Sequence, residues 1–413
     1  MPPVTPHRTP RLFAAMMAAV VVVIPASLLA QTSFRVEDFG AIGDGIHDDG
    51  PALRAAAAAL SNTVGPTTLS FGYGRTYRMG KESQAHGSIV FQSAKNLTIE
   101  GNGSTIVNHP DNRTLVLYRC EDVALRNITL DMDPPPFTQG RIQSIDVGGS
   151  RAEVLIDPGY PLPATGTTFA DNTSNDVMLY RRATRDPVGG VFSRKTEVVD
   201  LGNRVYRLAF RNSSLVESAV VGDFVTIKTA GEGTDLRTPD GSYIATAAAL
   251  INVQLSDRVT LEGVTSYASP GMTVRATSSD QLTIRRFALL RKSGTNRLIG
   301  SNKDGLHLKY FRVPPVIEDS RFEAGMDDTI NLSQPSCRVA TILAQNRVEA
   351  VDNDITLYNI DVRVGDTLLH YRFGTRVFGE HTVTVVEPVN RRRAIVTVTP
   401  AFSGDLRLDD TLV

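Results

Sequence analysis

The sequence predicts an all-β protein whose main part is a solenoid of parallel strands, a parallel β-helix. Three observations predict this class. Short segments that alternate apolar and polar residues recur along the chain, and such period-2 alternation indicates half-buried strands. Two of these segments, 257–261 and 280–284, begin 23 residues apart, and a repeat of roughly 20 to 50 residues indicates a solenoid. Asn, Asp and Gly separate the segments and favour turns at its corners.

The repeated segments place an apolar residue at the same phase. Ile99 and Leu125 lie 26 residues apart, and the pattern returns at Leu261, Ile284 and Ile317. In a solenoid, residues one repeat apart lie on neighbouring strands about 4.8 Å apart. We therefore expect these five side chains to stack in one column of the core.

The first thirty residues have the pattern of a cleaved secretory signal. Basic residues precede an apolar run from Leu12 to Leu29, and Ala30 supplies a small residue for cleavage. A membrane anchor is the alternative, because the run is almost long enough to span a bilayer. Pro25 and the small residues favour cleavage. We expect a secreted or periplasmic protein with no membrane attachment once the signal is removed.

The rest of the chain divides into repeat regions and interruptions. An alanine-rich helix is expected at 51–60, where it would cover the first coil. Gly222-Asp223 and Gly365-Asp366 each precede alternating apolar residues, which suggests two related antiparallel β modules inserted into the repeat. The expected regions are 1–30 for the signal peptide, 31–138 for the N-terminal cap and first coils, 139–245 for the first module, 246–338 for the coils with the candidate site, and 339–413 for the second module.

Composition limits the partners. The 43 basic and 44 acidic residues balance, so a nucleic-acid partner is not expected. Cys120 and Cys337 are too few for a disulfide framework and are expected to be separate buried thiols. The acidic cluster at 44–49 is interpreted as capping and turn chemistry rather than a calcium loop. We expect no cofactor and no metal, and the sequence does not indicate an oligomeric state.

Three aspartates are the candidate catalytic residues. Asp304 lies 23 residues before the pair Asp327-Asp328, so one repeat would bring the three carboxylates together. Hydrolysis of a glycosidic bond needs a protonated acid and a base or nucleophile. Repulsion within a carboxylate cluster raises the pKa of one member and leaves the others ionised. Neighbouring strand residues face opposite sides, so the pair must lie at a bend, which Gly325 would allow.

Three further residues are candidates for substrate binding because they lie beside the aspartates in sequence. They are Asn302, His307 and Asn331. For His307 a buried structural role remains an equal alternative. Lys303 is a candidate to neutralise a carboxylate. As a whole, the alternative interpretation of the site is a set of turn residues and solvated corners.

Several motifs resemble known families. The opening Asp38-Phe39-Gly40-Ala41 with Gly43-Asp44-Gly45 resembles pectin-lyase-like proteins. Four segments resemble glycoside hydrolase family 110, the exo-acting α-1,3-galactosidases. These segments are 97–103, 125–131, Asn302-Lys303-Asp304-Gly305-Leu306-His307, and 317–322 running on to Met326-Asp327-Asp328-Thr329-Ile330-Asn331.

The resemblance implies a right-handed β-helix with barrel-like insertions and an inverting mechanism that uses Asp304, Asp327 and Asp328. It implies release of terminal α-linked galactose from a carbohydrate partner, of the blood-group-B kind or from algal galactans. By analogy with polygalacturonases, Asp327 would be the acid and the other two would hold the attacking water. The chain departs from the family where Leu332 follows Asn331. It also lacks Trp and the family's later coils, and is therefore expected to be a shortened relative.

Three alternatives remain open at this stage. A polygalacturonase-like hydrolase would share the Asn-x-Asp-Gly and Asp-Asp motifs. A calcium-dependent polysaccharide lyase would need a denser carboxylate cluster and a basic residue as catalyst. A non-catalytic β-helix that binds glycans is the alternative from a different class.

Overall fold

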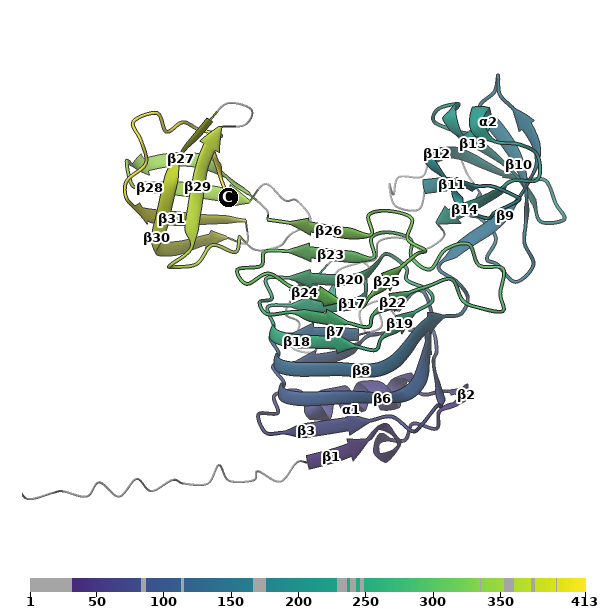
Figure 1. Cartoon of the computed structure of the whole chain (residues 1–413), viewed down its shortest axis with the longest axis horizontal. Coiled ribbons are helices and arrows are strands. Elements are labelled where there is room, and N and C mark those ends of the chain that lie inside the picture. Colours follow the sequence, from purple (N-terminus) through teal and green to yellow (C-terminus); the bar gives the residue numbers. More distant parts are fainter. Residues whose placement is uncertain are drawn as a thin grey trace, which may run out of the picture. The chain divides into compact units, whose positions relative to one another are not determined.

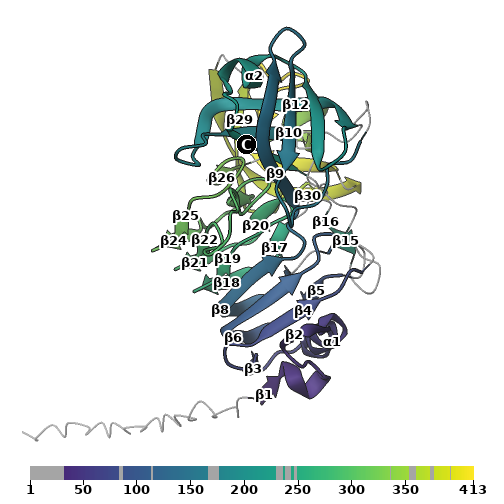
Figure 2. The ribbon, with the colours of Figure 1, turned by 90° about the vertical axis from the view of Figure 1, so that its right-hand side faces the viewer.

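Parallel strands stacked in two sheets form the central part of the molecule, which is a computed structural model (Figures 1 and 2). Through most of the stack, each strand of the second sheet is followed along the chain by one or two strands of the first sheet. The first sheet consists of β1 (Thr32–Arg35), β3 (Thr67–Ser70), β6 (Lys95–Asn108), β8 (Glu121–Met132), β18 (Asp257–Glu262), β21 (Thr283–Arg285) and β24 (Val316–Glu318), with β2 (Asp44–Asp48), β4 (Thr76–Met79), β19 (Thr265–Ser266), β22 (Ala288–Leu289) and β25 (Arg321–Phe322) paired beside them. The second consists of β5 (Ile89–Gln92), β7 (Leu115–Tyr118), β17 (Ala249–Gln254), β20 (Met272–Thr277), β23 (Leu306–Lys309) and β26 (Ile330–Ser333).

The described part of the chain excludes the N-terminus and several short segments. It consists of residues 32–82, 87–112, 115–165, 176–228, 236–237, 243–245, 249–334, 336–352, 360–372, 376–390 and 392–413. The expected signal peptide, 1–30, lies outside these residues. Within them, no helix has the length and apolar character needed to cross a membrane.

The pairing register confirms the predicted column of apolar residues. Ile99 pairs with Leu125, Leu125 with Leu261, Leu261 with Ile284, and Ile284 with Ile317. The first four are almost completely buried in the largest hydrophobic core, and Ile317 packs against it. The period-2 pattern therefore identified both the strands and the faces that they bury.

The predicted N-terminal helix is present as α1 (Gly50–Leu60). Pro51 lies in its first turn, where a missing N–H costs nothing. Leu53 and Leu60 pack into the core between the sheets. The short 3-10 helix η1 (Val36–Phe39) precedes it. The Asp44 carboxylate accepts hydrogen bonds from nearby backbone N–H groups, which is the predicted turn chemistry.

Two closed antiparallel barrels interrupt and follow the parallel strands. The chain leaves β8 at Met132 and enters the first barrel at Phe137, across three consecutive prolines at 134–136. The first barrel consists of β9 (Phe137–Asp146), β10 (Arg151–Ile156), β11 (Asp176–Tyr180), β12 (Pro187–Asp200), β13 (Val205–Phe210) and β14 (Phe224–Lys228), with the short helix α2 (Ser214–Ser218). The second barrel consists of β27 (Cys337–Ala344), β28 (Arg347–Asp352), β29 (Thr367–Arg372), β30 (Arg376–Asn390), β31 (Arg393–Thr399) and β32 (Thr411–Leu412). A small hairpin of β15 (Leu236–Arg237) and β16 (Tyr243–Ala245) lies between the first barrel and β17 in sequence.

Each barrel has its own hydrophobic core. The core of the first barrel also includes Leu298, Ile299 and Met326 from the parallel-strand region. The second barrel is joined to that region by polar contacts, among them a 2.8 Å hydrogen bond from the Tyr310 hydroxyl to Asp352. The prediction of a mostly β chain with parallel sheets and antiparallel modules is thus confirmed at this level.

The two cysteines are separate and buried, as predicted. Burial raises the pKa of the Cys120 thiol to about 11 and that of Cys337 to about 12. Neither thiol is therefore a nucleophile at neutral pH.

Candidate active site

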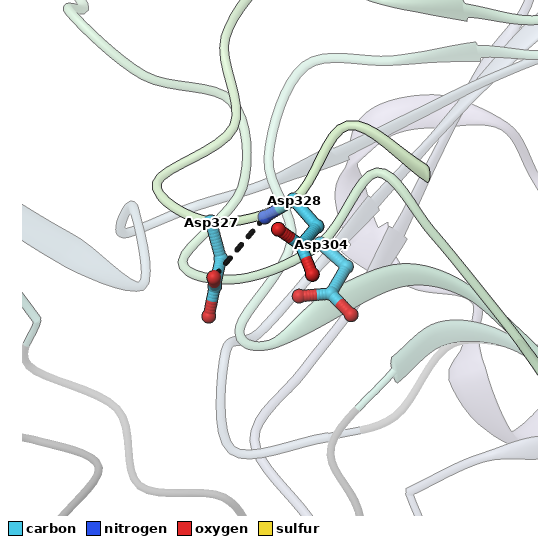
Figure 3. Close-up of side chains that lie close together, drawn as sticks. All are labelled: Asp304, Asp327 and Asp328. Atoms are coloured by element: carbon cyan, nitrogen blue, oxygen red, sulfur yellow. Dashed lines mark hydrogen bonds between the residues drawn. The ribbon is translucent and has the colours of Figure 1, made fainter. Parts of the chain in front are cut away.

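The structure brings the three predicted aspartates together. One carboxylate oxygen from each of Asp304, Asp327 and Asp328 lies within 4.8 Å of the other two. Figure 3 shows the three side chains on two neighbouring loops. Asp304 is 4 % exposed, whereas Asp327 and Asp328 are exposed to solvent. We call these residues the aspartate trio.

The backbone of two successive coils holds the trio in place. The N–H of Gly305 donates to the carbonyl oxygen of Asp328 at 2.9 Å, and that of Leu306 donates to Thr329 at 3.0 Å. The N–H of Met326 in turn donates to the carbonyl oxygen of Ser301 at 3.1 Å. Two loops that each precede a strand are therefore hydrogen bonded along their length.

The register corrects one detail of the sequence interpretation. The repeat between segments 257–261 and 280–284 is 23 residues, as Leu261 pairs with Ile284. In the next coils, however, His307 pairs with Asn331, an offset of 24 (331 − 307). Asp304 is therefore level with Asp328 rather than with Asp327. The coils of this solenoid-like stack differ in length, so a spacing measured on one coil does not transfer to the next.

Gly305 is required by the close approach of the two coils. A Cβ atom at this position would lie 2.6 Å from the carbonyl oxygen of Thr329 and 3.1 Å from a ring carbon of Phe322. Both distances are shorter than normal contacts. The Asp-Gly dipeptide of the predicted motif thus has a packing reason beyond turn formation.

Two predicted neighbours bond directly to the trio. His307 Nδ1 lies 2.5 Å from Asp304 Oδ2, and the Asn331 amide donates to Asp328 Oδ2 at 3.1 Å. His307 is 9 % exposed. Because His307 and Asn331 are paired on β23 and β26, each orients the aspartate that precedes it by three residues. A bend at Gly305 places Asp304 and His307 on the same side.

Asp327 occupies the bend that the sequence required. It lies outside regular strand, and the N–H of Asp328 donates to its Oδ1 at 3.1 Å (Figure 3). Partial desolvation raises the pKa of Asp327, and the negative charges of Asp304 and Asp328 raise it further. Lys228 acts in the opposite direction. Asp327 is thus the trio member held toward the protonated form.

Asn302 does not fit its predicted role. Its side chain is 1 % exposed, and its amide donates to the carbonyl oxygens of Pro136 and Pro270. We correct the predicted substrate contact to a structural one, because the amide group fastens three separate backbone segments. The local motif could not predict that Asn302 would lie against Pro136, just before β9, and Pro270.

The site includes charged residues that the sequence interpretation did not connect with it. Lys228 of β14 and Asp176 of β11, both in the first barrel, form an ion pair of 2.6 Å. Both act electrostatically on Lys303, as do Asp304 and Asp327, so the pair adjoins the site. Burial lowers the pKa of Lys303, and the positive charge of Lys228 lowers it further. Lys228 ends an otherwise uncharged strand, and no motif links it to residues about a hundred positions later.

Metal binding is a second possible use of such a cluster. Within the described residues, only the trio places three Asp, Glu, His or Cys ligand atoms this close. Two of its members already accept hydrogen bonds from His307 and Asn331. Calcium takes six to eight oxygen ligands, and the trio supplies three carboxyl groups. The trio has one carboxyl group held toward the protonated form and two others, the combination that acid–base chemistry needs.

Sequence comparison supports the predicted resemblance. Over 403 residues the chain is 21 % identical to α-1,3-galactosidase B of Akkermansia muciniphila, covering 92 % of this chain and 48 % of that protein. Over 414 residues it is 21 % identical to α-1,3-galactosidase A of Shewanella woodyi, covering 94 % and 65 %. No family model matches. The chain is thus similar to glycoside hydrolases named α-1,3-galactosidases, and it spans about half to two thirds of their length.

Solved structures give weaker similarities. A family 28 exopolygalacturonase of Yersinia enterocolitica has a TM-score of 0.38 at 12 % identity, covering 75 % of this chain and 46 % of that one. PfbA, a surface adhesin of Streptococcus pneumoniae, has a TM-score of 0.27 at 13 % identity, covering 70 % and 63 %. At these scores neither similarity carries a functional assignment.

Proposed function

We propose that this protein is a secreted or periplasmic glycoside hydrolase, an inverting exo-α-1,3-galactosidase that releases terminal α-linked galactose from glycans. The observation that carries the proposal is the aspartate trio, with carboxylate oxygens within 4.8 Å of one another. The similarity to proteins named α-1,3-galactosidases supports the choice of substrate.

The roles within the trio follow from charge and contacts. Asp327 is the general acid, because partial desolvation and neighbouring carboxylates raise its pKa and a protonated acid must assist the leaving oxygen. Asp304 and Asp328 hold the attacking water, because they are level on adjacent coils and each has a fixed hydrogen-bond partner. His307 and Asn331 contact these two aspartates and are the candidates to contact the sugar beside them.

For the fold, we propose a more specific architecture than two sheets of parallel strands. We interpret the stack as a right-handed parallel β-helix, with coils at 31–138 and 246–338, in which residues 139–245 and 339–413 are inserted modules. The alternation of the chain between two in-register parallel sheets supports this interpretation. The apolar N-terminal segment, 1–30, supports export through a cleaved signal.

Inversion is the part of the proposal that a product assay tests. Inverting pairs of carboxyl groups usually lie about 6.5–9.5 Å apart and retaining pairs about 5–5.5 Å. The carboxylate oxygens of the trio lie within 4.8 Å of one another, so inversion is proposed from the resemblance to the α-1,3-galactosidases and not from this spacing. We expect β-galactose as the first product from an α-galactoside, detected by proton NMR before mutarotation. Initial release of α-galactose would contradict inversion.

The activity itself is tested with a chromogenic α-galactoside. Asp327→Asn should reduce kcat by at least 10²- to 10⁴-fold, roughly the contribution of general acid–base catalysis. Asp319→Asn is a matched control. Asp319 is an exposed corner residue with φ of 49°, a conformation that Asn also accepts. Equal activity of the wild type and the Asp327→Asn variant would disprove the proposed function.

The remaining alternatives predict other results in the same assays. A polygalacturonase-like enzyme would hydrolyse polygalacturonate and leave the α-galactoside intact. A non-catalytic glycan-binding protein would bind galactose-terminated oligosaccharides without turnover. A lyase would lose activity on treatment with a chelator and regain it with calcium.

A further inference from the structure

The first barrel buries an ion pair at the edge of the candidate active site. Lys228 Nζ lies 2.6 Å from Asp176 Oδ2, and the Lys228 side chain is 4 % exposed. On the far side of Asp176, Arg194 Nε lies 3.5 Å from Oδ1. These residues belong to the adjacent strands β14, β11 and β12. Burying a lysine is costly unless it is paired, so its position calls for an explanation.

Packing turns this face of β14 toward the loop that carries Asp327. The hydroxyl of Thr226 lies 3.7 Å from the sulfur of Met326. Thr226 and Lys228 are two residues apart on one strand and therefore share a face. Met326, the residue before Asp327, is part of the hydrophobic core of the first barrel. The barrel thus approaches the trio through packed side chains.

We propose that the Lys228–Asp176 pair of the first barrel is a positioning element of the active site, which sets the charge environment of the acid Asp327. In this arrangement Lys228 is the positive group opposite the carboxylates, and Asp176 fixes its position and partly neutralises it. The kinetic meaning of this inference rests on the proposed hydrolase function. The electrostatic relation between the barrel and Asp327 is independent of the proposed hydrolase function.

The charged groups around Asp327 give the direction of the effect. Asp304 and Asp328 face it from the two stacked coils, and Lys303 also adjoins it. Lys228 faces it from the first barrel, with Asp176 and Arg194 behind, and His307 is bonded to Asp304. Desolvation and the other carboxylates raise the pKa of Asp327, and Lys228 lowers it. Removing either member of the barrel pair should therefore shift this pKa, in opposite directions.

The test compares the pH dependence of kcat/KM for Lys228→Met and Asp176→Asn. Activity falls at high pH when the general acid loses its proton. Lys228→Met should move this basic limb upward by on the order of half a pH unit, because a positive charge is lost. Asp176→Asn should move it downward by a similar amount, because Lys228 is no longer neutralised. Lys228→Arg keeps the charge and should restore the wild-type limb.

A structural role of the pair would give a different result. Loss of the pair would then lower thermal stability in both variants, and both basic limbs would stay in place or move in the same direction. Either of those results, in protein that remains folded, would overturn the proposal. Arg207→Met is the matched barrel control. It breaks the Arg207–Glu153 pair on the first barrel, in which both side chains are partly exposed, and should leave the limb unchanged.

A titration without substrate separates this inference from the proposed function. In protein labelled at the aspartate carboxyl carbons, the Asp327 resonance is assigned by its loss in Asp327→Asn. Its midpoint should rise in Lys228→Met and fall in Asp176→Asn. If no α-galactoside is hydrolysed but the midpoints move apart, the electrostatic inference holds and the proposed function fails. If the enzyme is active and the midpoints do not move, the inference fails alone.

Discussion

The two barrels have the same topology and different neighbours. Taken in chain order, β9 to β14 correspond to β27 to β32, and every neighbouring pair of strands in one barrel has its counterpart in the other. Each is closed by its first and last strands. One strand order therefore folds twice in this chain, although among the described residues only the first barrel contributes core contacts beside the aspartate trio.

A buried aspartate holds each barrel closed in the same way. Asp223, just before β14, accepts hydrogen bonds from the Arg181 side chain and from the N–H of Val220, three residues earlier. Asp410, just before β32, accepts them from Arg372 and from the N–H of Arg407, again three residues earlier. Both arginines lie at the end of the third strand of their barrel. The relationship of the modules is thus seen in their topology and in this contact.

The comparison shows that a shared scaffold can serve two purposes. The first barrel carries the Lys228–Asp176 pair on a strand that packs against Met326 beside Asp327. The second barrel encloses His370, which stacks on Phe378 and bonds to Asp410. We infer that changes to the Lys228–Asp176 pair or to β14 of the first barrel alter catalysis, whereas equivalent changes in the second barrel alter mainly its own stability.

Acidification should distinguish the barrels most strongly. Burial alone would raise the pKa of Asp410, but hydrogen bonds from Arg372 and His370 hold it below its usual value. Burial likewise opposes the lowering of the Asp361 pKa, which the charge of Arg312 produces. A carboxyl group whose pKa is depressed on folding stabilises the fold above its unfolded pKa, near 4, and this stability is lost as pH falls through the folded pKa. The second barrel should therefore lose stability below about pH 4.

Hydrogen-exchange protection of the two barrels at pH 7 and pH 3 measures this difference. The first and second barrels also carry one half-buried glutamate each with a lowered pKa, Glu153 and Glu349, but ion pairs near the surface contribute little. The effect of acid at Asp327 has the opposite sign, because its pKa is raised. Protonation there relieves its repulsion with Asp304 and Asp328. In Asp410→Asn the acid sensitivity of the second barrel should decrease. Earlier loss of protection in the first barrel would contradict the comparison.

The two buried aspartates allow a matched pair of substitutions. Asp223→Ala and Asp410→Ala each remove a carboxylate with several hydrogen-bond donors and should each cost about 3 kcal/mol of unfolding free energy in their own barrel. Only Asp223→Ala should also lower kcat, because β14 follows directly and carries Lys228. Chemical denaturation monitored per barrel, together with α-galactosidase assays, measures both effects. A similar loss of kcat in Asp410→Ala would show that the second barrel also supports the site.

The sequence was sufficient for the regular parts of this structure and for the existence of the site. Alternating residues around Ile99, Leu125 and Leu261 face a core that runs through the stack, so local pattern and tertiary burial agree. The trio could be predicted because two of its members are one coil from the third. The roles of its members were predicted only by analogy with polygalacturonases, because they depend on bonds formed across a turn, such as that of His307 to Asp304.

The rest depends on contacts that no local pattern encodes. The offset of 24 residues between the paired His307 and Asn331 follows from the length of the coil between them. The Gly-Asp dipeptides correctly indicated related modules, but Asp223 precedes the last strand of its barrel whereas Asp366 precedes the third strand. The true counterpart of Asp223 is Asp410, which follows another aspartate and lacks the glycine. Contacts between strands far apart in sequence decide such equivalences.

The attachment of the first barrel is tested by Met326→Ala. Met326 is 8 % exposed and packs in the barrel core next to Asp327. Truncating a buried methionine costs about 2 kcal/mol or more, and the cavity should loosen the Asp327 loop. We expect reduced thermal stability and a several-fold lower kcat with little change in KM. Met326→Leu preserves volume and should retain most of both. Equal kcat values for Met326→Ala and Met326→Leu would show that packing against the first barrel does not position Asp327.

The attachment of the second barrel is tested by Tyr310→Phe, with the smallest expected effect. The Tyr310 hydroxyl donates to Asp352 at 2.8 Å, and Asp352 is 1 % exposed. Losing a hydrogen bond to a buried carboxylate costs about 1.5–3 kcal/mol, and the aromatic ring remains in place. Calorimetry should show this loss of stability, while kcat and its pH profile stay those of the wild type, because Asp352 lies in the second barrel. A shift of the pH profile in Tyr310→Phe would mean that the second barrel also influences Asp327, and the division of roles between the barrels would then be wrong.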